Sequence, residues 1–492
     1  MNTITPTQNQ ISSISKKIGR IKKKSKKPNF KGWYLSTGLT QTSNAMIDPF
    51  FPLFAKSIGA SNAQIGLLSG LMSLISISQI LWTKLSQKVQ KSSIFVFIGQ
   101  FISFLLFIPY LFLRKGEILL LVVLRFFQGF FLSAAVPNQA NLMSDHIPEN
   151  ERATVITRFT RLGMIGGLVG SLLGGAIFTI IIAEQFLSEE DAYKFIFLLT
   201  LIFGIIASLI FFRSVTDKQI VESIDSINLI NRDLLLSTSK LSFTKKFTAY
   251  LKKFKNFWIF VVTAFIFYFS VYAASPFFIV LEIESFGFSF LDAAILTAIS
   301  LIIQIIVAMF LEKTKLLDLI GRKKILILGN LILIIATVLI LLPYFILQIP
   351  KFLWCIFAWS VLGCGWGFFN SAIAVTLLDI VHPKYRAMQI SYYNTIIGLA
   401  QFFGPVIGGL LIDFYSNNLI VVFIFRIIIL ILTFIPLFFV IEPEIPGIVF
   451  KPVRNVFPQL FRFNAAKGPD VVVSYGQSNK VRQTNLSNLP EK

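Results

Sequence analysis

The chain has 492 residues, of which 55% are hydrophobic and only 14% are charged. A soluble domain carries about 25% charged residues, and apolar content in runs of about 20 residues excludes a water-soluble fold. The net charge of +21 would suit a nucleic-acid-binding protein, but the basic residues lie between the apolar runs and do not form the basic patch that such binding requires.

Twelve apolar segments follow one another along the chain, each long enough to cross a hydrocarbon core of about 30 Å as a helix. Helices are expected because in lipid every backbone polar group must be satisfied within its own segment. The sequence therefore predicts an all-α membrane protein whose twelve transmembrane helices form two pseudo-symmetric six-helix bundles. The predicted spans are residues 33–56, 62–83, 93–113, 117–143, 153–183, 193–213, 257–280, 290–311, 324–349, 352–379, 387–414 and 417–441.

Polar segments divide the chain into five parts. A basic tail (1–32) precedes the first six spans (33–213), and a Lys-rich linker (214–256) separates them from the second six (257–441). The last part (442–492) is polar and contains prolines, and we expect it to be a disordered cytoplasmic tail.

The distribution of Lys and Arg predicts the orientation. With the N-terminus in the cytoplasm, the cytoplasmic side holds 38 of the 45 basic residues, so the positive-inside rule places both termini there. We expect a multi-pass protein of the plasma membrane whose tail KKIGRIKKKSKK (16–27) binds anionic lipid headgroups. A disordered tail that only satisfies the positive-inside rule is the alternative. The outer loops are expected to carry the acidic residues Glu184, Glu189, Glu190, Asp191, Glu282 and Glu284.

The residue types that serve catalysis and metal binding form no pattern. Cys355 and Cys364 lie nine residues apart in one span and face different sides of a helix. His146 and His382 lie in separate polar loops, so no metal cluster is expected. The sequence has no phosphate-binding loop and no nucleophile elbow. We therefore expect neither an enzyme nor a cofactor.

Two stretches of the first six spans recur in the second six. TKLSQKVQKS (83–92) parallels TKLLDLIGRKK (314–324) at a spacing of 231, and residues 148–178 parallel residues 383–413. Repeats of six spans place a binding site near the bilayer midplane, between the halves, and we expect a monomer. The pairs matched in the second stretch, all 234 residues apart, are Arg152 and Arg386, Ala153 and Ala387, Gly170 and Gly404, Gly174 and Gly408, and Gly175 and Gly409.

Over residues 33–441 these features resemble the major facilitator superfamily of transporters. DLIGRKK (318–324) is similar to its cytoplasmic signature and LRFFQG (124–129) to its fourth-span arginine motif. GGLVGSLLGG (166–175) is similar to the fifth-span motif of its exporters, and PFFPLFAKSIGASNAQIGLL (49–68) to the first outer loop of its efflux-type members. The resemblance implies a secondary transporter of the efflux or antiporter type that works by alternating access.

Two departures from the family pattern stand out. Gln87 and Gln90 replace the Asp and Gly of the cytoplasmic signature in the first half, which puts the usual inner-gate contacts in doubt. Ser171 stands where exporters usually have a proline, while the second half keeps Pro405. The second departure weakens the inference to antiport.

Two groups of residues are candidates for a conformational role. Asp318 precedes a helix that begins near Arg322, so its carboxylate can accept from free N–H groups, and Gly321 allows a tight turn. The small residues of the fifth-span motif and its second-half copy let neighbouring helices approach closely and slide. A solvated charged loop and static packing are the alternatives. The candidates in the second group are Gly170, Gly174, Gly404, Pro405 and Gly408.

Charged residues inside a span are costly and mark candidate functional sites. Asp48 lies eight residues from Lys56 at the outer edge of the first span, and Arg125 lies seven residues after Ile118 on a span that runs the other way. At 1.5 Å per residue these are depths of about 12 and about 10 Å from the same face, which predicts that Asp48 and Arg125 pair directly or through water. We expect Asp48 to take up a proton when substrate or a conformational change displaces Arg125. A structural ion pair with no part in coupling is the alternative.

Polar and aromatic residues at helical spacing predict a cavity that is charged in the first half and aromatic in the second. Aromatic rings with a polar edge bind flat lipophilic compounds, cations or sugars, and aromatic core packing is the alternative. Arg426 in the last span has no obvious partner and is expected to reach outward, toward Asp413 or the interface. The predicted cavity residues are Thr37, Gln41, Asn44 and Asp48 on span one, Arg125, Gln128 and Gln139 on span four, Tyr268, Tyr272 and Ser275 on span seven, and Trp359, Gly363, Trp366 and Asn370 on span ten.

The sequence thus predicts a secondary transporter that exports small amphipathic or lipophilic compounds, with protons as the candidate coupling ion. Import or uniport of a sugar-like or other small solute is an alternative of the same class. A non-transporting membrane receptor or scaffold with this fold is an alternative of another class. The altered signature around Gln87 and the long basic tails favour the scaffold, whereas the matching depths of Asp48 and Arg125 disfavour it.

Overall fold

A computed structural model of the chain describes residues 29–74, 78–147, 152–184, 188–215, 253–314, 316–346, 350–382 and 386–441. In this part of the chain ten spans have the length and hydropathy needed to cross a membrane. The first predicted span is not among them because the polar residues of α2 (Phe30–Ile47) lower its hydropathy. The second is described as two shorter helices, α4 (Asn62–Leu74) and α5 (Gln79–Val89). With these two, all twelve predicted spans are helical.

The first half follows the predicted order, with two spans divided by breaks. Span one ends as α2 at Ile47 and resumes as α3 (Phe51–Ser57), which has Pro52 in its first turn. Span three divides in the same way before Pro109, since proline lacks the N–H that continues a helix. The remaining helices are α6 (Ser92–Leu105), α7 (Phe107–Tyr110), α8 (Ile118–His146), α9 (Arg152–Ala183) and α10 (Glu189–Ser214).

The second half repeats this arrangement and corrects one boundary. Span seven was predicted to end at residue 280, but it continues through a 3₁₀ turn at Pro276 and a π-helical turn as far as Ser285. Glu282, expected in an outer loop, is therefore buried in a helical segment. Four other acidic residues expected in outer loops are helical as well: Glu284 in the same turn, and Glu189, Glu190 and Asp191 in the first turn of α10. The elements are α13 (Lys255–Ala274), η2 (Ser275–Phe277), α14 (Phe278–Val280), η3 (Leu281–Ser285), α15 (Phe290–Thr314), α16 (Leu316–Ile320), α17 (Arg322–Phe345), α18 (Lys351–Ile380), α19 (Arg386–Phe414), α20 (Ile420–Leu432) and α21 (Phe434–Phe439).

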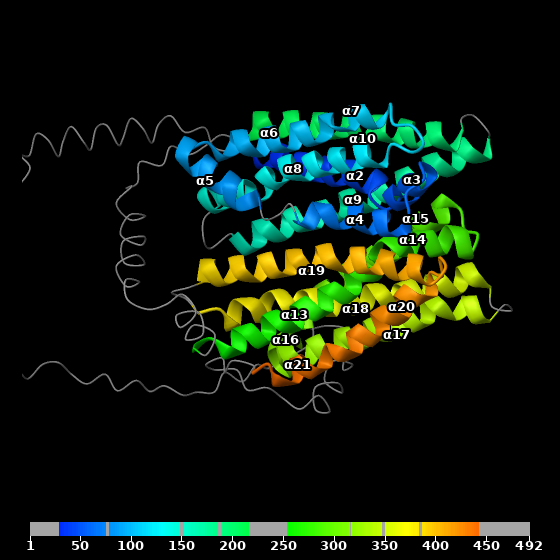
Figure 1. The fold of residues 1–492 in the computed structure, drawn as a ribbon. Coiled ribbons are helices and arrows are strands. Elements are labelled where there is room, and N and C mark those ends of the chain that lie inside the picture. The colour runs from blue at the N-terminus through cyan, green and yellow to red at the C-terminus, as the bar shows by residue number, and fades with distance from the viewer. Residues whose placement is uncertain are drawn as a thin grey trace, which may run out of the picture.

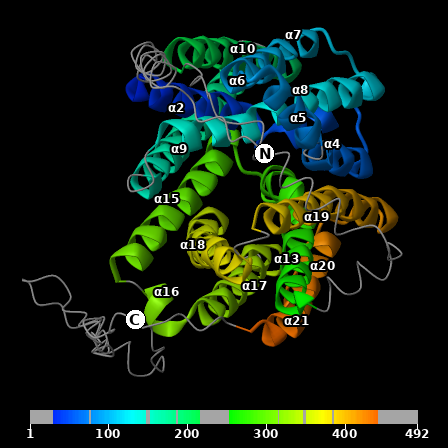
Figure 2. The same cartoon turned by 90° about the vertical axis from the view of Figure 1, so that its left-hand side faces the viewer.

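The long helices run roughly side by side, with the first half above the second in Figure 1. We call the end at which α2 begins and α21 finishes the terminal end, and the opposite end, which holds α3 and η3, the distal end. Viewed from the terminal end, α9 of the first half lies beside α15 of the second, and α4 lies beside α19 (Figure 2). The basic segment 16–27, nearly all of the predicted linker and the whole of the predicted C-terminal tail (442–492) lie outside the described residues.

The polar contacts between the two halves, within the described residues, gather at the distal end. Lys56 forms an ion pair with Glu284. The carboxylate of Asp413 accepts hydrogen bonds from the backbone N–H of Asn62 (3.2 Å), from its side-chain amide (2.8 Å) and from the backbone N–H of Ala63 (2.9 Å). The Asp413 contacts join the start of α4 to the end of α19, and the ion pair joins α3 to η3, so the distal end is closed.

Glycines allow the close helix contacts that support each half. An added Cβ at Gly170 or Gly174 of α9 would lie 2.2 and 2.4 Å from backbone oxygens of α2. In the second half, a Cβ at Gly408 of α19 would lie 2.1 Å from the backbone oxygen of Ala273 in α13, and Gly404 packs against the same helix. The repeated glycines therefore hold equivalent helix pairs together, and their part in movement stays a prediction.

Candidate substrate cavity

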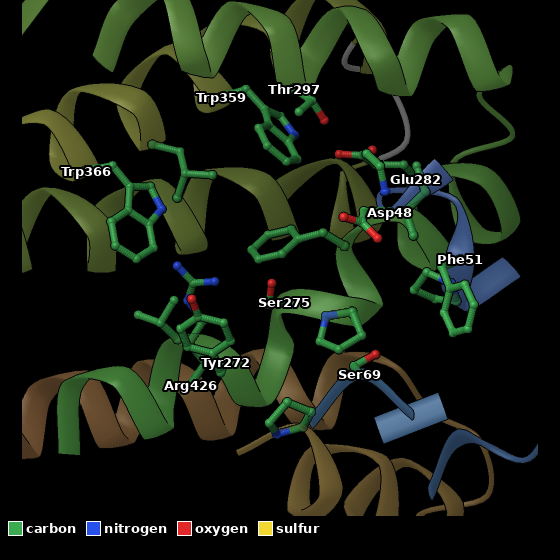
Figure 3. A pocket seen from close by; sticks show the side chains of 18 of the residues that line it. Asp48, Phe51, Ser69, Tyr272, Ser275, Glu282, Thr297, Trp359, Trp366 and Arg426 are labelled. Atoms are coloured by element: carbon green, nitrogen blue, oxygen red, sulfur yellow. The ribbon is translucent and has the colours of Figure 1, made fainter. Parts of the chain in front are cut away.

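A cavity of about 460 Å³ lies between the two halves. The break between α2 and α3 and the 3₁₀ and π-helical turns after α13 both line the cavity, and Figure 3 shows Asp48 of the first break beside Glu282 of the π-helical turn. Both helix breaks therefore face the site. Irregular backbone is tolerated at this depth because it lines a cavity and is not exposed to lipid. The residues that line it are Asp48, Pro49, Phe51, Pro52, Ser69, Arg125, Val271, Tyr272, Ser275, Pro276, Phe278, Ile279, Glu282, Thr297, Trp359, Leu362, Trp366, Pro405 and Arg426.

The structure brings Asp48 and Arg125 together. Their Oδ1 and Nη2 atoms are 3.5 Å apart, and 53% of the Asp48 side chain is exposed to the cavity. Arg125 also donates from Nη1 to Oε1 of Gln128 (2.9 Å) and lies over the Phe51 ring, 4.2 Å from its centroid. Tyr110 donates to the same Gln128 oxygen at 3.4 Å. Arg125 is thus held on three sides, whereas the carboxylate of Asp48 remains accessible.

The other predicted residues of the first half lie outside this set of cavity-lining residues. Thr37 donates to the backbone oxygen of Trp33 in its own helix (3.1 Å), Gln41 is exposed and Asn44 is half-buried. They continue the Asp48 face of α2 toward the terminal end. Gln128 does not line the cavity itself but positions Arg125, which does.

The aromatic wall predicted for the second half is present in part. Tyr272, Trp359 and Trp366 line the cavity, and Tyr268 lies behind Tyr272 with ring centroids 6.2 Å apart. Asn370 is exposed and lies one turn beyond Trp366, outside the lining residues.

Two charged residues that the sequence did not assign to the site line it as well. Glu282 is only 1% exposed and lies beside the indole N–H of Trp359. Arg426 is also 1% exposed and projects into the cavity (Figure 3). The expectation that Arg426 reaches outward, toward Asp413 or the interface, is wrong, because its side chain is buried at the cavity and Asp413 is bonded to the start of α4. The cavity is therefore charged in both halves, and not only in the first.

A repeat within the sequence contains a signal for Glu282. Pro49-Phe50-Phe51 recurs as Pro276-Phe277-Phe278 at a spacing of 227. In the first half this sequence opens a second helical segment that belongs to the same span. The recurrence predicts the same continuation after Pro276, which carries residue 282 into the span.

The residues with a predicted conformational role lie away from the cavity, except for Pro405. Gly321 has a φ of 101° and directly precedes α17, which requires a residue without a side chain at the turn. Arg322 is buried and forms an ion pair with the half-buried Asp379 of α18 at the terminal end. Asp318 lies inside the short helix α16, and its side chain is outside the described part of the structure.

Comparison with known proteins identifies the family. The model of the Major Facilitator Superfamily matches residues 33–314 and 260–471, which together cover most of the chain. The chain belongs to the major facilitator superfamily. Members of that superfamily are multi-pass transporters that sit in the lipid bilayer and bind small-molecule substrates.

Relatives within the superfamily include bacterial efflux proteins. A multi-drug resistance efflux pump PmrA homolog of Lactococcus lactis subsp. lactis is 27% identical over 162 residues, which are 32% of this chain and 39% of the relative. The multi-drug resistance efflux pump PmrA of Streptococcus pneumoniae serotype 4 is 25% identical over 162 residues, 31% of this chain and 38% of the relative. The matched region thus spans about two fifths of the length of these relatives.

Solved structures of the superfamily share the fold over nearly their whole length. A D-xylose–proton symporter gives a TM-score of 0.62 at 15% identity, covering 84% of this chain and 97% of the symporter. An inward-facing, occupied bacterial homologue of the human lysosomal transporter Spinster gives 0.61 at 15% identity, covering 84% and 95%. The nucleoside transporter NupG gives 0.59 at 14% identity, covering 84% and 98%. At these identities the likeness establishes the fold alone.

Proposed function

We propose that this transporter exports small amphipathic or lipophilic compounds by alternating access, with protons as the coupling ion. The observation that carries the proposal is the Asp48–Arg125 pair, which lies in a cavity between the halves and leaves Asp48 half exposed. A carboxylate inside a membrane protein that faces a cavity beside a cationic partner is suited to take up and release a proton. The Lactococcus and Streptococcus relatives are named as multi-drug resistance efflux pumps, which agrees with the direction proposed.

The proposed cycle depends on which end of the molecule faces the cytoplasm. The positive-inside rule assigns the terminal end to the cytoplasm of a plasma membrane. The closed distal end then faces outward, and the cavity receives substrate from the cytoplasmic side. Opening requires separation of α4 from α19, which breaks the Asp413 hydrogen bonds, and of α3 from η3, which breaks the Lys56–Glu284 ion pair. A monomer suffices, since both halves of the cavity come from one chain.

Each charge in the Asp48–Arg125 pair has a separate part in this proposal. While Asp48 is ionised, it is attracted to Arg125, which is fixed by Gln128 and Phe51. Protonation of Asp48 removes that attraction, and Arg125 then keeps its hydrogen bond to Gln128. The carboxylate is therefore sensitive both to pH and to a ligand that enters between the two side chains.

Flux through the purified protein tests the proposal. Proteoliposomes are assayed with a panel of lipophilic dyes, sugars and nucleosides, with and without an imposed pH gradient. Pumping of lipophilic compounds that depends on the gradient supports the proposal, and gradient-driven pumping that survives Asp48→Asn refutes the coupling role of Asp48. Flux of only the sugars or nucleosides assigns the solute-import alternative, and absence of all flux assigns the scaffold alternative.

A further inference from the structure

Arg426 is the cavity residue that the Asp48–Arg125 account does not use. It lies on α20, and its backbone oxygen accepts a hydrogen bond from Ser270 Oγ (2.7 Å), which ties α20 to α13 at this level. The guanidinium carbon lies 4.9 Å from the centroid of the Phe278 ring. In Figure 3 the side chain projects into the cavity, on the side where Tyr272 and Trp366 also lie. The guanidinium is therefore held by packing and aimed at the space a substrate would occupy.

This buried guanidinium has unused hydrogen-bond donors. Its Nε and Nη2 atoms are buried and have no hydrogen-bond partner among the described residues. Of the two carboxylates in the cavity, Asp48 pairs with Arg125, and Glu282 lies next to Trp359. In the part of the chain that the structure describes, none of the ion pairs includes Arg426. An uncompensated charge in the interior of a membrane protein is destabilising, so an anion that enters the cavity gains a strong partner there.

The surroundings of Arg426 define the chemistry of that anion. A guanidinium presents its N–H groups in a planar fork that matches the oxygens of a carboxylate, a sulfonate or a phosphate. Tyr272 and Ser275 contribute hydroxyl groups to the same cavity, and Phe278, Trp359 and Trp366 contribute apolar ring surface. Glu282 and Asp48 add negative charge elsewhere in the cavity, which disfavours a second anionic group on the ligand.

We propose that Arg426 is an anion-binding subsite of the cavity and that it selects diffusible amphipathic monoanions, with an aromatic or aliphatic body against the second-half wall. This inference rests on the proposed transport function, which it narrows to a substrate class. The subsite is separate from the Asp48–Arg125 pair, so one cavity contains both a proton-accepting carboxylate and a fixed cation for the substrate.

A matched pair of ligands tests the subsite. Biphenyl-4-carboxylate and biphenyl-4-methanol share one apolar body and differ in the anionic group. Their binding to the full chain in phosphatidylcholine nanodiscs is measured by isothermal titration calorimetry, with empty nanodiscs as the blank. A hydrogen-bonded charge pair is worth about 1.5–3 kcal/mol, so the wild type is expected to prefer the carboxylate by about 10- to 100-fold. Arg426→Gln is expected to abolish the preference, and Arg426→Lys to keep part of it.

The control variant is Arg114→Gln, which removes a positive charge from an exposed loop outside the cavity and is expected to leave the preference unchanged. If Arg426→Gln fails to fold, the subsite is tested in the wild-type protein by chemical modification. Phenylglyoxal modification of Arg426, followed by mass spectrometry, is expected to be slowed by the carboxylate and not by the alcohol. Equal protection by both ligands, or a carboxylate preference that survives Arg426→Gln, overturns the proposal.

Two further arms separate this inference from its alternatives. Nanodiscs that contain phosphatidylglycerol test a lipid headgroup as the occupant: unchanged carboxylate affinity supports a diffusible anion, and competition refutes it. Flux assays separate the subsite from transport. Carboxylate preference that depends on Arg426 but comes without flux supports the subsite and refutes the proposed function. Flux together with a carboxylate preference that is independent of Arg426 supports the proposed function and refutes the subsite.

Discussion

The cap that Asp413 places on α4 is expected to control the balance between closed and open distal ends. Asp413→Ala removes the acceptor for two backbone N–H groups and one side-chain amide of the other half. When the distal end opens, water takes the place of these hydrogen-bond partners. The Asp413 cap therefore stabilises the closed state only by the difference in free energy between its hydrogen bonds and those with water. The substitution therefore acts on one state of the transporter and leaves the other nearly unchanged.

The magnitude follows from comparison with helix caps. An aspartate that satisfies the first N–H groups of a helix is worth up to about 2 kcal/mol, and a loss of that size shifts the equilibrium about 30-fold toward the open distal end. The Lys56–Glu284 pair is the natural comparison, because both side chains are more than one third exposed. Exposed ion pairs contribute about 0–1 kcal/mol, so Lys56→Gln is expected to shift the equilibrium by less than about fivefold.

Double electron–electron resonance measures this equilibrium. Spin labels replace Lys115 and Tyr415, which are exposed on opposite halves of the distal end, in a chain with both cysteines changed to alanine. Asp413→Ala is expected to move population from the short to the long distance. A second pair, at Lys91 and Lys313 of the terminal end, is expected to shift in the opposite direction.

Two results would refute the reasoning. An Asp413→Ala shift no larger than that of Lys56→Gln would mean that the carboxylate cap does not stabilise the closed distal end. Separation at the distal end without a matching approach at the terminal end would mean that the halves do not rock as two bodies.

Three further substitutions are expected to act locally. Gly170→Ala places a Cβ 2.2 Å from the Thr42 carbonyl oxygen and is expected to lower the thermal unfolding midpoint, with a cost of about 1–3 kcal/mol; Gly167→Ala, which meets no atom within 4 Å, is the control, and equal midpoints contradict the packing argument. Gly321→Ala imposes a side chain at φ 101° and is expected to cost about 1–3 kcal/mol in the same assay, so an unchanged midpoint would show that the turn relaxes. Trp366→Ala is expected to weaken calorimetric binding of both biphenyl ligands about tenfold through lost apolar contact, and loss of the carboxylate preference instead would contradict the separation of wall from subsite.

The hydrophobic pattern predicted the spans well because lipid imposes one strong requirement on each of them. The breaks were harder to place, since Pro276 and the acidic residues after it have the composition of a loop. In the structure, Pro276 instead starts a 3₁₀ turn and the chain stays helical to Ser285. The sequence of span seven alone does not distinguish a proline kink from the end of a span. Comparison with Pro49, the counterpart of Pro276 in span one, does distinguish them.

The sequence predicted the candidate site best for residues whose depth in the membrane can be counted from the end of a span. Asp48 and Arg125 stand alone in apolar sequence, and counting residues gave them similar depths. Helical spacing identified the face of Trp359 and Trp366 but not where the cavity ends, so Asn370 was included although it lies outside. The direction of Arg426 depends on packing against Phe278 and on the Asp413 contact with α4, and both are tertiary contacts that the sequence of α20 does not contain.

Proton movement coupled to substrate tests the central claim most directly. Proteoliposomes loaded with the pH indicator pyranine receive a lipophilic substrate identified in the flux panel, and internal pH is followed for the wild type and for Asp48→Asn. The account predicts a substrate-dependent pH change in the wild type that disappears in Asp48→Asn while binding persists. A pH change of the same size in both proteins, or substrate flux with no proton movement in the wild type, would contradict it.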